Sequence, residues 1–160
     1  MKKVLIVVDM QKGFIKYDNY KLLSKNIDQY INNSNYDVVI MTKFVNKSGS
    51  MYEKKLDYKN LQSQESQQFS IHTPKNAIIF EKYGYGLENN DLNIVKNLSV
   101  DSVDICGLQT DACIYAISLQ LWDNGIYPNI LINYTATDPK KEKYAKQMLI
   151  HQFGKVDEKM

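Results

Sequence analysis

Residues Val4-Leu5-Ile6-Val7-Val8 form a continuous apolar run that is followed directly by Asp9. The run is rich in β-branched residues and has the length of one strand. Because its hydrophobicity does not alternate, it is typical of a strand buried on both faces, as in a parallel sheet. Four later runs have the same character, and we predict strands at residues 37–44, 77–80, 103–106 and 127–132.

Segments with helical periodicity separate these runs. Their apolar side chains recur three or four residues apart, which is the spacing of one helix face. The predicted helices cover roughly residues 20–33, 90–98, 111–124 and 139–152. Strands that alternate with helices indicate an α/β protein, a three-layer α/β/α fold with a mostly parallel central sheet. We expect residues 1–160 to form a single domain.

Residues 45–74 are the exception, because they show no clear period and include a polar stretch from Gln62 to Gln68. In a compact domain, a segment of this length is usually a functional lid or a binding loop. A short helix near Tyr52–Leu56 is compatible with the pattern. The sequence leaves open whether the segment closes over a site.

Composition narrows the range of partners. The chain is 44% hydrophobic and 24% charged, and no apolar run approaches the ~20 residues of a membrane span. All 20 basic residues are lysines, and the net charge is only +2, so we expect no nucleic-acid or membrane partner. Neither a dinucleotide-binding nor a P-loop glycine motif is present. The N-terminus lacks a secretory signal pattern, and we therefore expect a cytoplasmic protein.

Three reactive side chains fall where predicted strands end. Asp9 follows the first strand, Lys82 ends the third, and Cys113 follows the fourth. Carboxyl ends of parallel strands share one edge of a sheet, which is where ligands of such folds bind. Each residue also has an ordinary interpretation: a turn-capping aspartate, a solvated surface lysine and a buried small hydrophobic cysteine.

Cys113 lies in the first turn of its predicted helix, with Thr110 or Asp111 as the N-cap. The helix dipole there favours a thiolate, so we expect a lowered pKa for Cys113. Cys106 lies inside a predicted strand and is expected to be buried.

The two histidines offer little chemistry at the predicted sheet edge. His151 falls on the last predicted helix, which leaves only His72, in the long loop, as a possible histidine partner for the thiol. A histidine-based metal site is not supported.

Three sequence motifs, around Asp9, Lys82 and Cys113, resemble those of one protein family. Asp9-Met10-Gln11-Lys12-Gly13-Phe14 resembles D-x-Q-x-x-F. Glu81-Lys82-Tyr83-Gly84-Tyr85-Gly86 resembles the family lysine with its aromatic-rich turn. Gly107-Leu108-Gln109-Thr110-Asp111-Ala112-Cys113 resembles G-x-x-T-D-x-C. The three motifs together resemble those of the isochorismatase-like cysteine hydrolase superfamily, which includes nicotinamidases and N-carbamoylsarcosine amidohydrolase. The resemblance covers nearly the whole chain.

This resemblance implies a catalytic triad of Asp9, Lys82 and Cys113. The implied activity is hydrolysis of a C–N bond in a small amide or carbamoyl substrate through a thioester, without a metal or organic cofactor. It also implies a cis peptide at Leu108–Gln109 and an oxyanion hole made by the backbone N–H groups of Gln109 and Cys113. Gln109 departs from the small or branched residue often found there, so the role of its side chain stays open. Related folds form dimers or larger assemblies, and we expect a homo-oligomer.

The substrate pocket is expected to include the aromatic residues Phe14, Phe44, Tyr83 and Tyr85. The sequence departs from two kinds of member of this superfamily. Nicotinamidases carry an aspartate and several histidines after the second strand, whereas residues 45–50 contain none, and true isochorismatases lack the cysteine that stands here at 113. Two other functions remain: a non-catalytic binding or scaffold protein that retains the fold, and a redox-sensing thiol.

Overall fold

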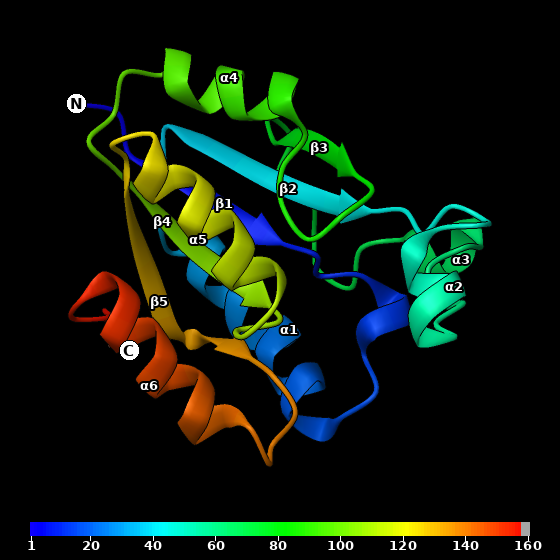
Figure 1. The fold of residues 1–160 in the computed structure, drawn as a ribbon. Coiled ribbons are helices and arrows are strands. Elements are labelled where there is room, and N and C mark those ends of the chain that lie inside the picture. Colours follow the sequence, from blue (N-terminus) through cyan, green and yellow to red (C-terminus); the bar gives the residue numbers. More distant parts are fainter. Residues whose placement is uncertain (158–160) are drawn as a thin grey trace.

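A five-stranded sheet runs through the centre of the computed structural model, which describes residues 1–157 (Figure 1). Every pair of neighbouring strands is parallel, in the order β3-β2-β1-β4-β5. The strands are β1 (Val4–Val8), β2 (Val38–Phe44), β3 (Ile78–Lys82), β4 (Ser102–Leu108) and β5 (Tyr127–Ala136).

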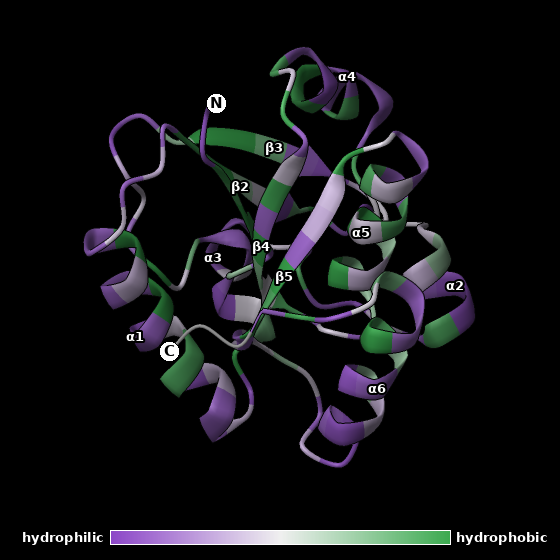
Figure 2. Cartoon of the chain, turned by 90° about the vertical axis from the view of Figure 1, so that its left-hand side faces the viewer, coloured by the Kyte–Doolittle hydropathy of each residue, from purple (hydrophilic) through white to green (hydrophobic). Residues whose placement is uncertain are grey.

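Helices cover both faces of the sheet, and the predicted three-layer fold is confirmed. Leu5 and Val7 of β1 share a core with α1, whereas Ile6 and Val8 point to the opposite core, beneath α4, α5 and α6. Figure 2 shows apolar residues along the sheet and hydrophilic residues on the outer helices. No helix within residues 1–157 is long and apolar enough to cross a bilayer. The long helices are α1 (Asp18–Asn32), α4 (Asn89–Asn97), α5 (Cys113–Asp123) and α6 (Glu142–Phe153).

The apolar pattern predicts burial on both faces, which is correct for the central strand β1 and wrong for the edge strand β3. All five residues of β1 are buried. β3 forms the edge of the sheet, and its Ile78 and Ile79 are 37% and 43% exposed. An edge strand needs no two-sided burial, and a short apolar run does not reveal its place in the sheet. At the other edge, β5 continues four residues past the predicted end at 132.

The last helix begins later than predicted, at Glu142 instead of residue 139. A turn precedes it, closed by a hydrogen bond of 2.7 Å from the Lys141 N–H to the Asp138 carbonyl. Asp138 and Pro139 therefore belong to this turn, although they have the pattern of a helix start.

Three short helices gather beyond the carboxyl ends of β1 and β2 (Figure 1): η1 (Lys12–Phe14), α2 (Met51–Leu56) and α3 (Gln64–Gln67). The buried side chain of Gln11 ties this region together. Its amide nitrogen donates to the carbonyls of Phe44 (2.9 Å) and Gln67 (3.1 Å), and its oxygen accepts from the Phe44 N–H (2.9 Å). The segment 45–74 is therefore fastened to the sheet edge, although its sequence shows no period.

The strand order reverses between β1 and β4, because the chain builds outward to β3 and then returns to the other side of β1. Ligands of open α/β sheets bind at such a point. Gly107 allows the two strands to approach closely, since it has a φ of +116° and a Cβ there would lie 2.2 Å from the Val8 carbonyl oxygen. A cis peptide joins Leu108 to Gln109 immediately afterwards.

Candidate active site

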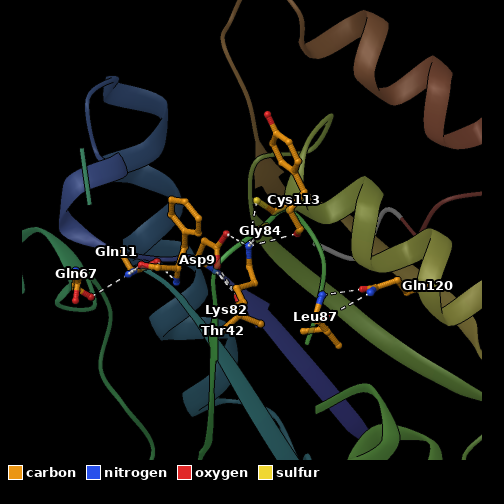
Figure 3. A network of polar contacts seen from close by, with 11 residues as sticks. Asp9, Gln11, Thr42, Gln67, Lys82, Gly84, Leu87, Cys113 and Gln120 are labelled. Carbon is orange, nitrogen blue, oxygen red and sulfur yellow. Dashed lines mark hydrogen bonds and ion pairs between the residues drawn. The ribbon is translucent and has the colours of Figure 1, made fainter. Parts of the chain in front are cut away.

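A buried ion pair lies at the carboxyl edge of the sheet (Figure 3). Lys82 Nζ is 2.9 Å from Asp9 Oδ2, and the two side chains are 0% and 1% exposed. Lys82 is therefore not a solvated surface lysine. Asp9 has a φ of 51°, in the left-handed region that few non-glycine residues adopt. Taking both charges out of water is costly, so the pair depends on well-aligned partners.

The ammonium of Lys82 finds its other partners on the turn that follows β3 and on Cys113. It donates to the Gly84 carbonyl at 2.7 Å and lies 3.4 Å from the sulfur of Cys113, with the Tyr85 carbonyl at 3.3 Å. An ammonium has three N–H groups. Asp9, Gly84 and Cys113 can therefore use all three, and the lysine brings carboxylate and sulfur together around one nitrogen.

Helix α5 holds the turn at residues 83–87 in place through Gln120 (Figure 3). The Gln120 Oε1 accepts from the Leu87 N–H at 2.7 Å, and its Nε2 donates to the Leu87 carbonyl at 3.0 Å. The same helix carries Cys113 at its first residue. The sulfur and the carbonyls that bind Lys82 are therefore positioned by one rigid element.

The pKa of Cys113 is raised, contrary to the prediction from its place at a helix start. Burial raises the pKa most, and the Asp9 carboxylate raises it further, which together outweigh the opposing effect of Lys82. The pKa of Lys82 also rises: burial lowers it, but the charge of Asp9 and the contact with Cys113 more than compensate. At neutral pH the resting site thus holds a protonated thiol beside a charged lysine.

The predicted N-cap of α5 is wrong as well. Ala112 occupies the cap position and offers no side-chain acceptor. Thr110 instead donates to the Thr135 hydroxyl at 3.0 Å, and Asp111 accepts from the Thr137 hydroxyl at 2.6 Å. Both side chains fasten the segment before α5 to the end of β5, which a reading of helix capping alone does not reveal.

Thr42, which the sequence analysis missed, orients the carboxylate of Asp9. Its hydroxyl donates to Asp9 Oδ1 at 2.6 Å and accepts from the Asp9 N–H at 3.0 Å. The side chain is 0% exposed. A threonine inside a strand is common, so the only signal in the sequence was its place near the end of β2, beside Asp9.

Replacing Thr42 by valine is expected to lower the free energy of unfolding by about 1.5–3 kcal/mol, because it leaves two buried polar groups of Asp9 without partners. Serine at the same position keeps the hydroxyl and loses one methyl group, which costs roughly 1 kcal/mol or less. Urea unfolding of both variants measures the difference. A valine variant as stable as the wild type would show that Asp9 does not depend on this hydroxyl.

A cavity of about 220 Å³ opens above Asp9 and Cys113. Phe14, Phe44 and Tyr85 line it, whereas Tyr83 lies outside, with the ammonium of Lys47 3.7 Å from the centre of its ring. The segment 45–74 adds four lining residues that the sequence analysis did not identify. They are Tyr52, Leu56, Tyr58 and Asn60.

Other reactive side chains lie away from this cavity. His72 is exposed, and its backbone N–H donates to Asp28 at 2.7 Å. Neither His72 nor His151 lines the cavity. Cys106 is fully buried in β4, and burial raises its pKa. Within residues 1–157, no group of three or more His, Cys, Asp or Glu side chains is close enough to hold a metal ion.

The sequence has no match among the curated proteins that were compared with it. Similar solved structures include the pyrazinamidase of Pyrococcus horikoshii in complex with zinc, with 19% identity, a TM-score of 0.81 and coverage of 98% of both chains. An isochorismatase-like hydrolase from Alkaliphilus metalliredigens is 15% identical, with a TM-score of 0.84 over 98% of this chain and 94% of that one. The N-carbamoylsarcosine amidase of Thermoplasma acidophilum is 18% identical, with a TM-score of 0.76 over 100% and 99%.

At these identities, the likeness to the solved structures shows a shared fold. The family model for the isochorismatase domain goes further, because it matches residues 3–156. That match takes in the buried ion pair, the cysteine and the residues that line the cavity. The chain therefore belongs to the isochorismatase domain family.

Proposed function

We propose that the protein is a hydrolase that cleaves a C–N bond of a small amide or carbamoyl compound, with Cys113 as the nucleophile. The observation that carries the proposal is the contact of Lys82 with both Asp9 (2.9 Å) and the Cys113 sulfur (3.4 Å) at the wall of a cavity. Structural neighbours named pyrazinamidase and N-carbamoylsarcosine amidase support the choice of a C–N bond. A binding protein would not need a costly buried ion pair beside a thiol.

The charges support proton transfer during the attack, not before it. In the resting site, Asp9 and Lys82 neutralise each other and the thiol is uncharged. A thiolate would add one uncompensated negative charge to a buried site, which is why the pKa of Cys113 is raised. As the sulfur bonds to the substrate carbonyl carbon, the thiol proton passes to the Asp9 carboxylate.

The negative charge then moves from the sulfur to the carbonyl oxygen. The backbone N–H groups of Gln109 and Cys113 are proposed to stabilise that oxyanion. Asp9 returns the proton to the nitrogen, the C–N bond breaks, and ammonia or an amine leaves. The acyl group remains on Cys113 as a thioester.

Water completes the cycle. Asp9, again a carboxylate, accepts a proton as water attacks the thioester carbonyl carbon. The C–S bond breaks, the acid product leaves, and the proton on Asp9 returns to the Cys113 sulfur. Lys82 stays charged throughout and balances the charge as it moves between Asp9, sulfur and oxygen.

We propose no step that passes through a metal. The Pyrococcus horikoshii structure contains zinc, but the donor set of this chain does not fit such an ion. The segment after β2 offers Asn46, whose amide instead donates to the carbonyls of Tyr58 and Asn60 at 2.9 Å each. No histidine lines the cavity.

A screen for ammonia release tests the proposed function. Nicotinamide, pyrazinamide, N-carbamoylsarcosine, benzamide and a short aliphatic amide would each be incubated with the purified protein. We expect release of ammonia from at least one of them and, after an acid quench, an acyl adduct on Cys113 by mass spectrometry. A compound that binds with no turnover and no adduct would instead favour the scaffold function.

Removal of the Asp9 charge is expected to make Cys113 more reactive toward iodoacetamide. In the wild type the raised pKa keeps the sulfur protonated at pH 7.5, so alkylation is slower than for a free thiol, whose pKa is about 8.5. In Asp9→Asn, the Lys82 ammonium has no carboxylate beside it and stabilises the thiolate. The pKa of Cys113 falls, and we expect alkylation at pH 7.5 to accelerate more than ~10-fold, the effect of one pKa unit.

Mass spectrometry of the alkylated protein measures both cysteines in one experiment. Buried Cys106 serves as the internal control and should remain unmodified in both proteins. Unchanged or slower alkylation of Cys113 in the Asp9→Asn variant would mean that the carboxylate does not control the thiol.

A further inference from the structure

The turn at residues 83–87 supplies the backbone carbonyls that bind the ammonium of Lys82. Two of its five residues are glycines, Gly84 and Gly86. Glycine has more backbone freedom than any other residue, so the turn does not by itself hold its carbonyls in one orientation. An anchor outside the turn is needed to fix them.

Gln120 of α5 is such an anchor, because its amide binds both backbone groups of Leu87 (Figure 3). Oε1 accepts from the Leu87 N–H at 2.7 Å, and Nε2 donates to the Leu87 carbonyl at 3.0 Å. Since a backbone N–H only donates and a carbonyl only accepts, the amide has one orientation. Gly86 leaves room for it, because a Cβ at that residue would lie 2.7 Å from Gln120 Oε1.

The place of the turn decides where the third N–H of Lys82 points. An ammonium has three N–H groups in a fixed tetrahedral arrangement. Two of them are taken by Asp9 at 2.9 Å and the Gly84 carbonyl at 2.7 Å, which leaves the third for the Cys113 sulfur at 3.4 Å. The Tyr85 carbonyl, 3.3 Å from the same nitrogen, competes with the sulfur for this N–H. A displaced turn therefore turns the ammonium away from the sulfur.

We propose that Gln120 is a positioning residue: it holds the turn in the place from which Lys82 directs an N–H to the Cys113 sulfur. Gln120 lies outside the wall of the cavity, so it acts through the turn and not on a substrate. Its expected effect on ammonia release rests on the proposed function. Its expected effect on the sulfur does not, because that effect is measurable without a substrate.

Two variants remove the anchor in different ways. Gln120→Met keeps the length of the side chain but cannot bind the backbone of Leu87. Gly86→Ala keeps the glutamine, and its new methyl group displaces the amide. Asn124→Ala is the control, because it removes a side-chain amide from the end of the same helix, where the amide donates to the Gln120 backbone carbonyl at 2.8 Å and not to the turn.

For the amide found in the ammonia screen, we expect Gln120→Met and Gly86→Ala each to lower kcat about 10- to 100-fold. A displacement of about 1 Å in a catalytic group can cost ~10²-fold in rate. KM should change less than ~3-fold, and Asn124→Ala should keep the wild-type kcat. A raised KM with an unchanged kcat would overturn the proposal, because the turn would then serve the shape of the cavity and not the reaction.

Alkylation of Cys113 by iodoacetamide at pH 9 is the readout that needs no substrate. Lys82 is the group that lowers the pKa of this thiol, against burial and Asp9. An ammonium turned away from the sulfur stabilises the thiolate less, so the pKa should rise by about half a unit to one unit and alkylation should slow about 3- to 10-fold. The three variants keep all ionisable groups near the sulfur, namely Asp9 and Lys82 beside it and Lys16, Tyr52, Tyr58 and Tyr85 in the cavity wall.

The direction of the change separates positioning from loosening. A turn that only loosens exposes the sulfur to water, which lowers its pKa and accelerates alkylation. Faster or unchanged alkylation in both variants would therefore overturn the proposal. If Gln120→Met does not unfold cooperatively, Gly86→Ala carries the test. If the wild type releases ammonia from no amide, the proposed function fails, while the alkylation rates still decide whether Gln120 directs Lys82.

Discussion

Replacing Cys113 by alanine is expected to lower ammonia release at least ~10⁴-fold, to the level left by substrate binding alone. Loss of a nucleophile in a hydrolase that forms a covalent intermediate typically costs between about 10⁴ and 10⁶ in kcat. Neither histidine lines the cavity, and the hydroxyls that do belong to tyrosines. Burial raises the pKa of Tyr52 and of Tyr58, so neither is ionised at neutral pH. Neither the histidines nor these two tyrosines are therefore a ready substitute for the sulfur.

Cys106→Ala provides the matched control. It removes the same atom from the other cysteine, which is buried in β4 and lies opposite Val7 in the strand register. We expect it to keep wild-type activity and to lose roughly 1 kcal/mol of stability through the missing side-chain volume. The initial rate of ammonia release and the urea midpoint, measured for both variants, separate a chemical effect from a folding effect.

An active Cys113→Ala variant would remove the thioester from the mechanism. The remaining Asp9–Lys82 pair would then have to activate water directly. A variant without activity that still binds the amide with wild-type affinity has the behaviour expected of a lost nucleophile. Trapping of an acyl group on the wild-type sulfur, and its absence in the variant, completes the comparison.

The sequence predicted the sheet and its helices because continuous apolar runs and helical periods are local properties. It also placed Asp9, Lys82 and Cys113 at one sheet edge, since parallel strands share the direction in which they end. The structure adds that the three side chains meet around one buried nitrogen. Their distances depend on the turn at residues 83–87 and on Gln120, which no local pattern indicates.

The sequence analysis failed where the outcome depends on competing long-range effects. The helix start alone favours a thiolate at Cys113, but burial and the Asp9 charge reverse the sign. Thr110 and Asp111 have the residue types of N-caps, yet they bond to Thr135 and Thr137 near the end of β5 instead. The contributions of Tyr52 and Tyr58 were missed because a segment without a period gives no direction for its side chains.

Replacing Lys82 by methionine is expected to produce the largest loss of stability, about 3–5 kcal/mol, because it leaves the buried Asp9 carboxylate without its counter-charge. Methionine is similarly long and unbranched, so the change is mainly electrostatic. The folded protein raises the pKa of Lys82. The contribution of the ammonium is therefore fully present below the ordinary lysine pKa of about 10.4 and is lost only as the pH rises through the folded-state value. This contribution of the ammonium in the wild type should consequently be the same at pH 6 and pH 8.

The double variant Asp9→Asn/Lys82→Met separates the cost of an unpaired charge from the cost of lost packing. It removes both charges, and the asparagine that replaces Asp9 can still accept from Thr42, so we expect it to regain most of the stability that Lys82→Met loses. It should nevertheless release no ammonia, since no carboxylate remains to carry the proton. Urea unfolding of the wild type, both single variants and the double variant gives the coupling energy directly. If Lys82→Met does not fold, cooperative unfolding of the double variant still shows that the unpaired charge of Asp9, and not the lost packing of Lys82, prevents folding. Additive losses in the two single variants would contradict a charge-paired site, because two groups that need each other cannot be removed at independent cost.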